Sequence, residues 1–293
     1  LVEVLCMKNY IKLMRPKHYL KNILIMLPLV FSGSIFDVKK DIVTILGLLS
    51  FCFAASFVYV INDIKDREKD KLHEKKKNRP IASGMISVRN AIIFGVLLLV
   101  LSYVFNLLGT KQFLNMSYIY IIIYVLLNIL YSFGLKDIPL LDVAILVSGF
   151  LIRVLYGSSL INVEISNWLY LTIISISFYL GLGKRRNELS KSSTTRKVLK
   201  YYNHEFLDKN MYMCLSISII FYSLWCVDPI TVSKTNNLLI WTIPMIILLC
   251  MKYSMDIEND GYGDPVDVIT DDKVLLLLSL ICGIYMFIVM YFI

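Results

Sequence analysis

The sequence predicts an all-α integral membrane protein with nine transmembrane helices. Of its 293 residues, 57% are hydrophobic and only 18% are charged, whereas soluble domains are about 45–50% apolar and about 25% charged. A disordered chain would lack this share of apolar residues. The charged residues gather in a few runs separated by long, nearly charge-free stretches. Alternation with a period of two residues, which a membrane β-barrel requires, is absent, so the pattern favours a helical bundle.

Nine segments have the length and composition of a spanning helix, which needs about 20 mostly apolar residues. The first of them is short and contains Pro28. The loops between the segments are too short to form a soluble domain, so residues 1–293 are predicted to form a single transmembrane domain. In order, the predicted spans are 22–36, 42–61, 90–108, 117–134, 139–160, 166–183, 211–228, 237–255 and 273–293.

The basic residues indicate how these spans are oriented. With nine alternating spans, one side of the membrane holds the N-terminal segment and the loops at 62–89 and 184–210, together with Lys136, Lys252 and Lys273. This side carries 25 of the 30 lysine and arginine residues. The positive-inside rule therefore predicts that the N-terminus and the large loops are cytoplasmic. Topology thus explains why the positive excess of this chain, whose net charge is +8, lies on one side.

An acidic cluster follows the second predicted span directly. Asn62, Asp66 and Asp70 recur at intervals of four residues, with Asp63 beside them. On a helix that continues out of the span, these side chains would point in one direction. Carboxylates at this spacing repel one another, so a cation is expected to join them. Mg²⁺ is the natural candidate, because it takes one or two carboxylates and completes its shell with water and substrate phosphate. The alternative is a solvated helix end whose acids are offset by neighbouring basic residues.

A basic run comes next and contains Lys77 and Arg79, ahead of a tight segment at 80–84. Basic residues beside carboxylates suit a polyphosphate bridged by a metal ion, since lysine and arginine can bind the remaining oxygen atoms. The alternative is a role in topology and in attraction to anionic lipid, which contributes about 1 kcal/mol per basic residue near the surface.

Basic residues elsewhere also have two interpretations. Arg153 lies inside the fifth span, where a charge costs at least about 2.5–3.5 kcal/mol on insertion scales. It must therefore face the bundle interior or a wet cavity, and it is expected to bind phosphate unless it pairs with Asp142. Lys136, Lys184 and Arg185 lie at the ends of spans. They are candidate phosphate ligands, although snorkelling or topology would also account for them.

Several segments together resemble the UbiA superfamily of membrane prenyltransferases. NDIKDREKD at 62–70, followed by RPIASG at 79–84, resembles the first aspartate-rich motif of that family. RPKHYLKN at 15–22 resembles an RPxxWxKN opening, with Tyr19 in place of tryptophan. YSFGLK at 131–136 and GKRRNEL at 183–189 resemble later blocks. The resemblance implies a nine-helix bundle with a central cavity that opens to the cytoplasm and to lipid.

The later blocks resemble one branch in particular, the polyprenyl-phosphate phosphoribosyltransferases. Typical family members carry a second aspartate-rich motif after the sixth span, where this chain has Lys184, Arg185 and Arg186. The resemblance implies a Mg²⁺-dependent enzyme of the cell membrane that acts in the supply of a cell-wall precursor. Such an enzyme transfers 5-phosphoribosyl from 5-phospho-α-D-ribose 1-diphosphate to a polyprenyl phosphate, such as decaprenyl phosphate, and releases diphosphate.

The same resemblance assigns roles to individual residues. The catalytic and metal-binding residues would be Asn62, Asp66 and Asp70. The substrate-binding residues would be Lys21, Lys77, Arg79, Tyr131, Lys136, Arg153, Lys184 and Arg185.

Other functions stay open on sequence alone. A prenyltransferase with an isoprenyl diphosphate donor and an aromatic acceptor would share the first motif, but it predicts acids where Lys184 and Arg185 stand. A lipid transporter or a scaffold would explain the spans, but not an acidic cluster followed by a basic run. No nucleic-acid partner is expected, because no recognised nucleic-acid module is present. The acidic loop at 256–272 could hold a second metal, and the chain could form a homo-oligomer.

Overall fold

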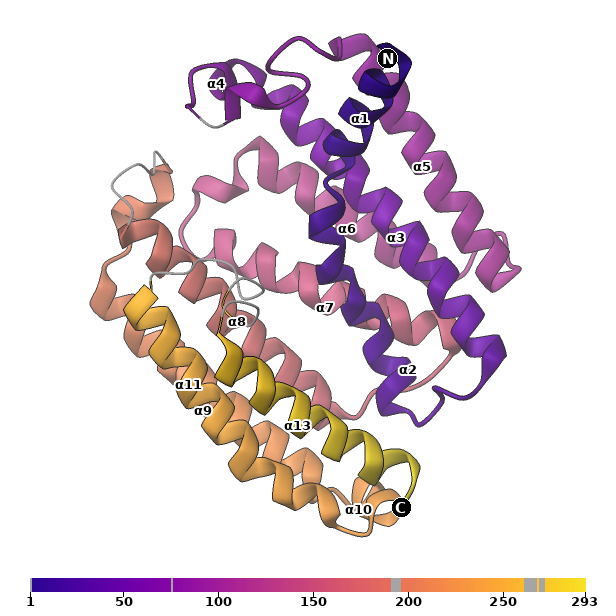
Figure 1. The fold of residues 1–293 in the computed structure, drawn as a ribbon, viewed down its shortest axis with the longest axis vertical. Coiled ribbons are helices and arrows are strands. Elements are labelled where there is room, and N and C mark those ends of the chain that lie inside the picture. The colour runs from indigo at the N-terminus through magenta and orange to yellow at the C-terminus, as the bar shows by residue number, and fades with distance from the viewer. Residues whose placement is uncertain (1, 75, 191–195, 261–267, 269–271) are drawn as a thin grey trace. The chain divides into compact units, whose positions relative to one another are not determined.

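The computed structural model describes residues 2–74, 76–190, 196–260, 268 and 272–293, and every regular element in these ranges is a helix (Figure 1). The expectation of an all-helical fold is therefore confirmed for the described residues. The chain divides into two compact units. One comprises Leu1–Lys136 and Ile152–Glu164, and the other comprises Asp137–Leu151 and Ile165–Ile293.

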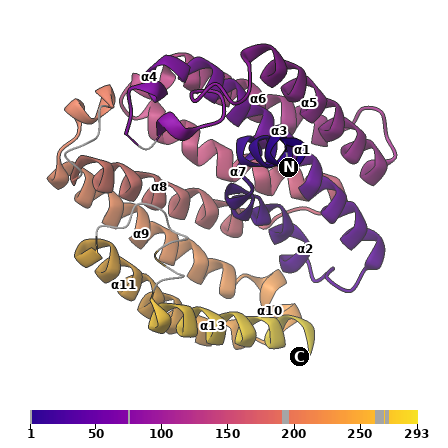
Figure 2. The same cartoon turned by 45° about the horizontal axis from the view of Figure 1, so that its top comes forward.

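The first unit is built around α3 (Val38–Lys65), which packs along α5 (Val88–Thr110) and also contacts α6 (Met116–Phe133) (Figures 1 and 2). The remaining elements of this unit are shorter. They are α1 (Val2–Met14), η1 (Pro16–Met26), α2 (Leu27–Phe31), α4 (Arg67–Lys71), η2 (Lys76–Asn78) and the C-terminal half of α7 (Leu141–Ile161).

Short polar side chains begin the long helices of this unit. Asp37 accepts from the backbone N–H of Lys39 at 3.0 Å and so caps α3. Ser87 caps α5 and Asn115 caps α6 in the same way. Each cap satisfies a backbone donor that has no partner within the helix, typically contributing about 1 kcal/mol. The sequence thus sets where α3, α5 and α6 start.

Aromatic residues from three helices form the core of the first unit. Phe51 of α3, Tyr124 of α6 and Tyr156 of α7 are buried together, and the Phe51 ring centroid lies 4.6 Å from that of Tyr124. Gly157 allows η1 to approach α7 closely, since a Cβ atom there would lie 2.1 Å from the carbonyl oxygen of Ile25. The N-terminal segment is therefore packed directly against the membrane helices of its unit.

The second unit consists mainly of paired long helices. In it, α8 (Asn167–Ser190) packs against α9 (His204–Cys226), and α11 (Thr242–Asp260) packs against α13 (Lys273–Tyr291). Its buried cluster includes Val143, Tyr179, Leu182 and Leu207. The shorter elements are η3 (Leu135–Asp137), η4 (Lys197–Tyr201), α10 (Pro229–Thr235) and η5 (Leu238–Trp241), of which η3 begins in the first unit.

Six helical segments of the described chain are long and apolar enough to cross a membrane. They correspond to the predicted spans 42–61, 90–108, 117–134, 139–160, 237–255 and 273–293. A seventh would be the pair α9 and α10, which is bent by 60° and contains the predicted span 211–228. A multi-pass integral membrane protein is therefore indicated.

Two predicted spans look different in the structure. Residues 22–36 are not one long helix, because the 3₁₀ segment η1 leads into the five-residue helix α2 with Pro28 in its first turn. Residues 166–183 do lie in a long helix, α8, which is less apolar because it carries several serines and ends in charged residues. The count of nine spans and the single-domain assignment both stay predictions.

Candidate functional site

The acidic motif lies where α3 ends and α4 begins. Asp66 is the residue between the two helices, with φ −87° and ψ 6°. Its backbone N–H donates to the carbonyl of Asn62 at 2.9 Å, and the N–H of Asp70 donates to the carbonyl of Asp66 at 2.8 Å. Helical hydrogen bonding thus continues through this position, although the two helices are separate elements.

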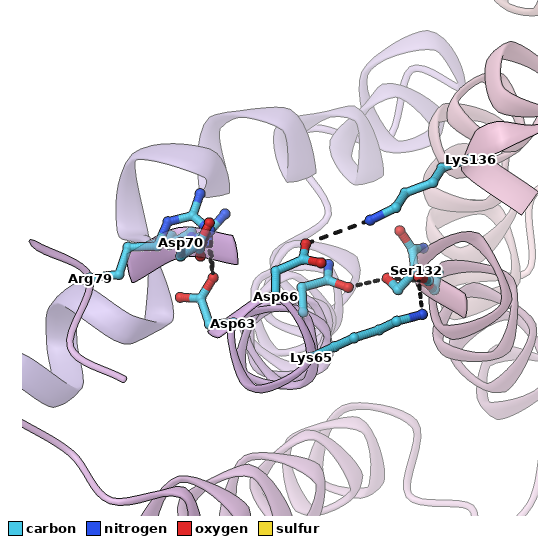
Figure 3. Close-up of polar contacts among 10 residues, drawn as sticks. Asp63, Lys65, Asp66, Asp70, Arg79, Ser132 and Lys136 are labelled. Carbon is cyan, nitrogen blue, oxygen red and sulfur yellow. Dashed lines mark hydrogen bonds and ion pairs between the residues drawn. The ribbon is translucent and has the colours of Figure 1, made fainter. Parts of the chain in front are cut away.

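One part of the motif faces the C-terminal end of α6. The Ser132 hydroxyl donates to Asn62 Oδ1, and Lys65 Nζ donates to the Ser132 carbonyl oxygen (Figure 3). Lys136 Nζ lies 3.6 Å from the Asp66 carboxylate. The Asp66 side chain keeps 29% of its surface exposed. Asn62 and Asp66 therefore present an amide oxygen and a carboxylate at one partly open place.

The other part of the motif is closed by arginines (Figure 3). Arg79 Nη1 lies 2.6 Å from Asp70 Oδ2 and 3.1 Å from Asp63 Oδ1. Arg15 forms a second ion pair with Asp63, and its guanidinium lies 4.9 Å from the centre of the Tyr59 ring. Asp63 and Asp70 are 2% and 4% exposed. Both carboxylates are therefore buried and ion-paired.

This arrangement corrects the expectation that Asn62, Asp66 and Asp70 share one face. Asn62 contacts Ser132 at the end of α6 and Asp66 faces Lys136 of η3, whereas Asp70 joins Asp63 at Arg79. The physical reason is the interruption at Asp66, since a four-residue spacing keeps side chains on one face only along an unbroken helix. Sequence reasoning assigned no role to Arg15 or Ser132.

Arg153 is buried in the core of the first unit, at 7% exposure. Its Nε donates to Asn22 Oδ1 at 2.8 Å, and its Nη2 donates to the Tyr124 hydroxyl at 3.3 Å. The guanidinium also lies over the rings of Phe51 and Tyr124, at 5.3 and 5.0 Å from their centres. Polar and aromatic neighbours thus hold this charge inside the helix bundle, as its position in the sequence requires.

A second buried ionic group lies in the second unit. Arg185 is fully buried and lies 2.5 Å from Asp142 and 2.7 Å from Glu188. The Tyr202 hydroxyl donates to the other Asp142 oxygen at 2.6 Å and accepts from the N–H of Leu140 at 2.7 Å. Burial and the neighbouring Asp142 carboxylate raise the pKa of Tyr202 to about 12. Asp142 therefore pairs with Arg185, and the sequence-based alternative of an Asp142–Arg153 pair is wrong.

The remaining predicted substrate-binding residues differ in exposure. Lys77 is exposed in η2, the short 3₁₀ helix that follows α4. Lys21, Tyr131 and Lys184 are intermediate. Most of the acidic loop at 256–272 lies outside the described residues. Within the described part, Lys252 bonds Asp256 and lies 2.6 Å from Asp272, and this contact holds the pKa of the Asp272 carboxyl below its usual range.

The oxygen atoms of Asn62 and Asp66 are of the type that a hard divalent cation prefers. No group of three or more His, Cys, Asp or Glu residues that could hold a metal occurs in the described part of the chain. One carboxylate with one amide fits an ion such as Mg²⁺, which binds through one or two carboxylates and takes its other ligands from water and substrate phosphate. The donor set at Asn62 and Asp66 is thus compatible with such an ion.

The fold and the polar groups define a multi-pass membrane protein with an oxygen-rich site at the end of a long helix. In a comparison of the sequence with known protein families, residues 24–183 match the UbiA prenyltransferase family. The chain belongs to this family.

Its relatives include decaprenyl-phosphate phosphoribosyltransferases. The Corynebacterium glutamicum enzyme is 31% identical over 92% of this chain and 83% of its own length. The Mycobacterium tuberculosis enzyme is 30% identical over 92% of this chain and 90% of its own length. Among solved structures, a UbiA homolog from Archaeoglobus fulgidus bound to GPP and Mg²⁺ has a TM-score of 0.67 at 20% identity, covering 96% of this chain and 99% of the homolog. The latter likeness supports the fold.

Proposed function

We propose that this protein transfers a 5-phosphoribosyl group from 5-phospho-α-D-ribose 1-diphosphate to a polyprenyl phosphate and releases diphosphate. The observation that carries this proposal is the similarity to decaprenyl-phosphate phosphoribosyltransferases, which extends over 92% of the chain at 30–31% identity. The partly buried Lys136 beside Asp66 and Arg79 beside Asp70 add support, because the donor and the acceptor both carry phosphate.

The reaction needs little chemistry from the protein itself. An oxygen of the acceptor phosphate attacks C1 of the ribose while the bond between C1 and the diphosphate oxygen breaks. The acceptor phosphate is already an anionic nucleophile, so no general base is required. What the protein must supply is orientation of the two substrates and stabilisation of the charge that develops on the leaving diphosphate.

Asn62 and Asp66 would hold a Mg²⁺ ion, with Asp70 one turn further along. When bound, this ion would stabilise the negative charge on the leaving group. Asp70 contacts Arg79 in the present conformation, so its part would be to fix the surrounding loop or to exchange partners when substrate enters. Structures of a UbiA homolog from Archaeoglobus fulgidus contain bound Mg²⁺ or Cd²⁺, which supports a metal dependence.

The basic residues would divide the phosphates between them. Lys136 lies beside Asp66 and suits the diphosphate. Arg153 is held by Asn22 and Tyr124 and suits a phosphate that enters the bundle. Further contacts would come from Lys21, Lys77, Arg79 and Tyr131. Arg185 is fully buried between Asp142 and Glu188, so we assign it a structural part instead of a contact with substrate.

The site would face the cytoplasm, in a bundle of nine spans whose central cavity opens to the cytoplasm and to lipid. The distribution of basic residues supports this orientation. The apolar tail of the acceptor would lie between helices, with its phosphate at the membrane surface.

The proposal is tested with purified protein, Mg²⁺, decaprenyl phosphate and labelled phosphoribosyl diphosphate. We expect labelled lipid and released diphosphate in equal amounts, and neither after addition of EDTA. A parallel reaction contains geranyl diphosphate and 4-hydroxybenzoate instead. A product only in that reaction would select the prenyltransferase alternative, and no metal-dependent product in either would favour a transporter or a scaffold.

A further inference from the structure

Four charged side chains form what we name the arginine–aspartate network: Arg15, Asp63, Arg79 and Asp70. Arg15 pairs with Asp63, Asp63 pairs with Arg79 at 3.1 Å, and Arg79 pairs with Asp70 at 2.6 Å. The charges alternate in sign along this chain of contacts. Because Asp63 and Asp70 are buried, each requires a cationic partner. None of these contacts uses Asn62 or Asp66.

The network spans the junction between α3 and α4. Asp63 lies in the last turn of α3, and Asp70 lies in α4. A single nitrogen of Arg79 contacts both carboxylates, so it ties the two helices together across Asp66. The orientation of α4 relative to α3 therefore depends on this contact, and so does the direction in which the Asp66 carboxylate points.

Arg15 determines whether Arg79 can serve both acids. Asp63 is shared between two arginines, and without Arg15 it would depend on Arg79 alone. Arg79 would then be drawn toward Asp63 and away from Asp70. The local structure around Arg15 is unusual, because its φ is 56° immediately before Pro16, a conformation rarely adopted by a residue other than glycine. Such a conformation persists where surrounding contacts enforce it, here the Asp63 pair and the Tyr59 ring.

We propose that Arg15 and Asp63 are positioning residues for the metal-binding oxygens. Through Arg79 and Asp70 they fix the junction at Asp66, so that Asn62 faces Ser132 of α6 and Asp66 faces Lys136 of η3. Neither residue contacts the substrate. This inference rests on the metal role proposed above for Asn62 and Asp66.

The test uses the full-length protein in detergent, with Mn²⁺ as the probe, because Mn²⁺ accepts the same oxygen ligands as Mg²⁺ and can be followed by electron paramagnetic resonance. For Arg15→Ala we expect Mn²⁺ binding to weaken about tenfold, the lower range for loss of an outer-shell partner. Amide hydrogen exchange should become faster at 64–72 and stay unchanged in α5 and α6, since only the junction is released. Arg15→Lys should recover part of the affinity, because it keeps the charge but lacks the planar fork.

Two further variants separate a positioning role from general damage. Arg186→Ala removes an arginine from another ion pair of similar exposure, since the Arg186 and Arg15 side chains are 21% and 22% exposed. The Arg186→Ala protein should bind Mn²⁺ as tightly as the wild type. The double variant Arg15→Ala/Asp63→Asn should bind no more weakly than the worse single variant, because both changes break the same contact.

Unchanged Mn²⁺ affinity and unchanged exchange in Arg15→Ala would overturn the proposal. If amide exchange rises throughout the Arg15→Ala protein, that variant is damaged as a whole, and the nearly isosteric Asp63→Asn is tested in its place. Mn²⁺ affinity and amide exchange equal to those of the wild type in Asp63→Asn would overturn the proposal equally. Wild-type protein that binds no Mn²⁺ would overturn the metal-positioning role. If Arg15→Ala weakens Mn²⁺ binding but the wild type transfers no phosphoribosyl group, this inference stands and only the proposed reaction fails.

Discussion

Asp66 differs from the two aspartates on either side of it. Asp63 and Asp70 are buried and paired with arginine. Asp66 is 29% exposed and has Lys136 at 3.6 Å, which is longer than a direct hydrogen bond. A carboxylate in this setting can exchange its lysine neighbour for a metal ion at low cost.

The first prediction concerns this carboxylate. Asp66→Asn keeps the shape of the side chain but removes the charge that would hold the metal. Because a metal ion supplies several kcal/mol of charge stabilisation in the transition state, turnover should fall about a hundredfold or more. Phosphoribosyl transfer in membranes measures the effect. Glu68→Gln is the matched control, since Glu68 contacts Arg67 and Lys71 at the surface, and it should retain activity. Equal activity of both variants would contradict the assignment.

The second prediction concerns Arg153. Arg153→Lys keeps the charge but cannot contact Asn22 and Tyr124 together in the present geometry. We expect kcat/KM to fall for the substrate whose phosphate this residue binds, with a smaller change for the other substrate. Tyr124→Phe removes only the 3.3 Å contact and should have a milder effect. The test measures kcat/KM of Arg153→Lys separately for the donor and the acceptor. A wild-type value for both substrates would exclude a contact between Arg153 and phosphate.

At this scale the sequence predicted the chemical character of the cluster better than the arrangement of its residues. The spacing of Asn62, Asp66 and Asp70 predicted a polar cluster, and the structure has one. Spacing could not predict that the helix is interrupted at Asp66. The interruption is slight, since the backbone hydrogen bonds made by Asp66 change little from those of a helix. Nor could spacing predict that Asp70 pairs with Arg79, which depends on the path of an irregular loop. For Arg15, the only sequence signal was its place before Pro16 in the N-terminal motif.

Among the elements, the start of α7, the end of α8 and η4 are joined by one buried ionic group. Asp142 of α7 forms an ion pair with Arg185 of α8 and accepts a hydrogen bond from the hydroxyl of Tyr202, which follows η4. The sequence placed Arg185 in a basic run with Lys184 and Arg186. Successive residues of a helix point in directions about 100° apart, so one member of such a run can point inward while its neighbours do not. Arg185 is buried, and Lys184 and Arg186 are intermediate.

The third prediction follows from this arrangement. Asp142→Asn leaves Arg185 buried with less compensating charge, and breaking a buried ion pair in this way costs about 3–5 kcal/mol. Tyr202→Phe removes two hydrogen bonds, the one donated to Asp142 and the one accepted from the N–H of Leu140, and should cost about 2–3 kcal/mol. The matched control is Asp208→Asn at the partly exposed pair with Arg186, which should cost about 1 kcal/mol or less. Chemical unfolding in detergent measures all three, and equal stability of Asp142→Asn and wild type would contradict a structural role for this group.

For the whole molecule, composition and the placement of charges predicted the class of protein. Six of the predicted spans correspond to long apolar helices, because a run of about 20 apolar residues has few alternatives to a membrane helix. Residues 22–36 show the limit of this reasoning. Pro28 can be accommodated in the first turn of a short helix, so apolar composition there does not require one continuous span. Hydropathy reports the apolar composition of residues 22–36, whereas the position of Pro28 determines whether they form a single helix.

The fourth prediction tests the orientation of the molecule in the membrane. If the basic loops are cytoplasmic, Lys76 in η2 and Gln112 between α5 and α6 must lie on opposite sides of the membrane. A single apolar helix, α5, separates the two positions. Both residues are exposed, so a cysteine at either place should be accessible to a reagent without repacking.

The experiment uses a background in which the six native cysteines are replaced by serine or alanine. In this background, Gln112→Cys should react with a membrane-impermeant maleimide in intact cells. Lys76→Cys should react only after the membrane is opened. The reverse pattern would put the acidic motif outside the cell, away from a cytoplasmic supply of phosphoribosyl diphosphate, and would contradict the proposed function together with the orientation.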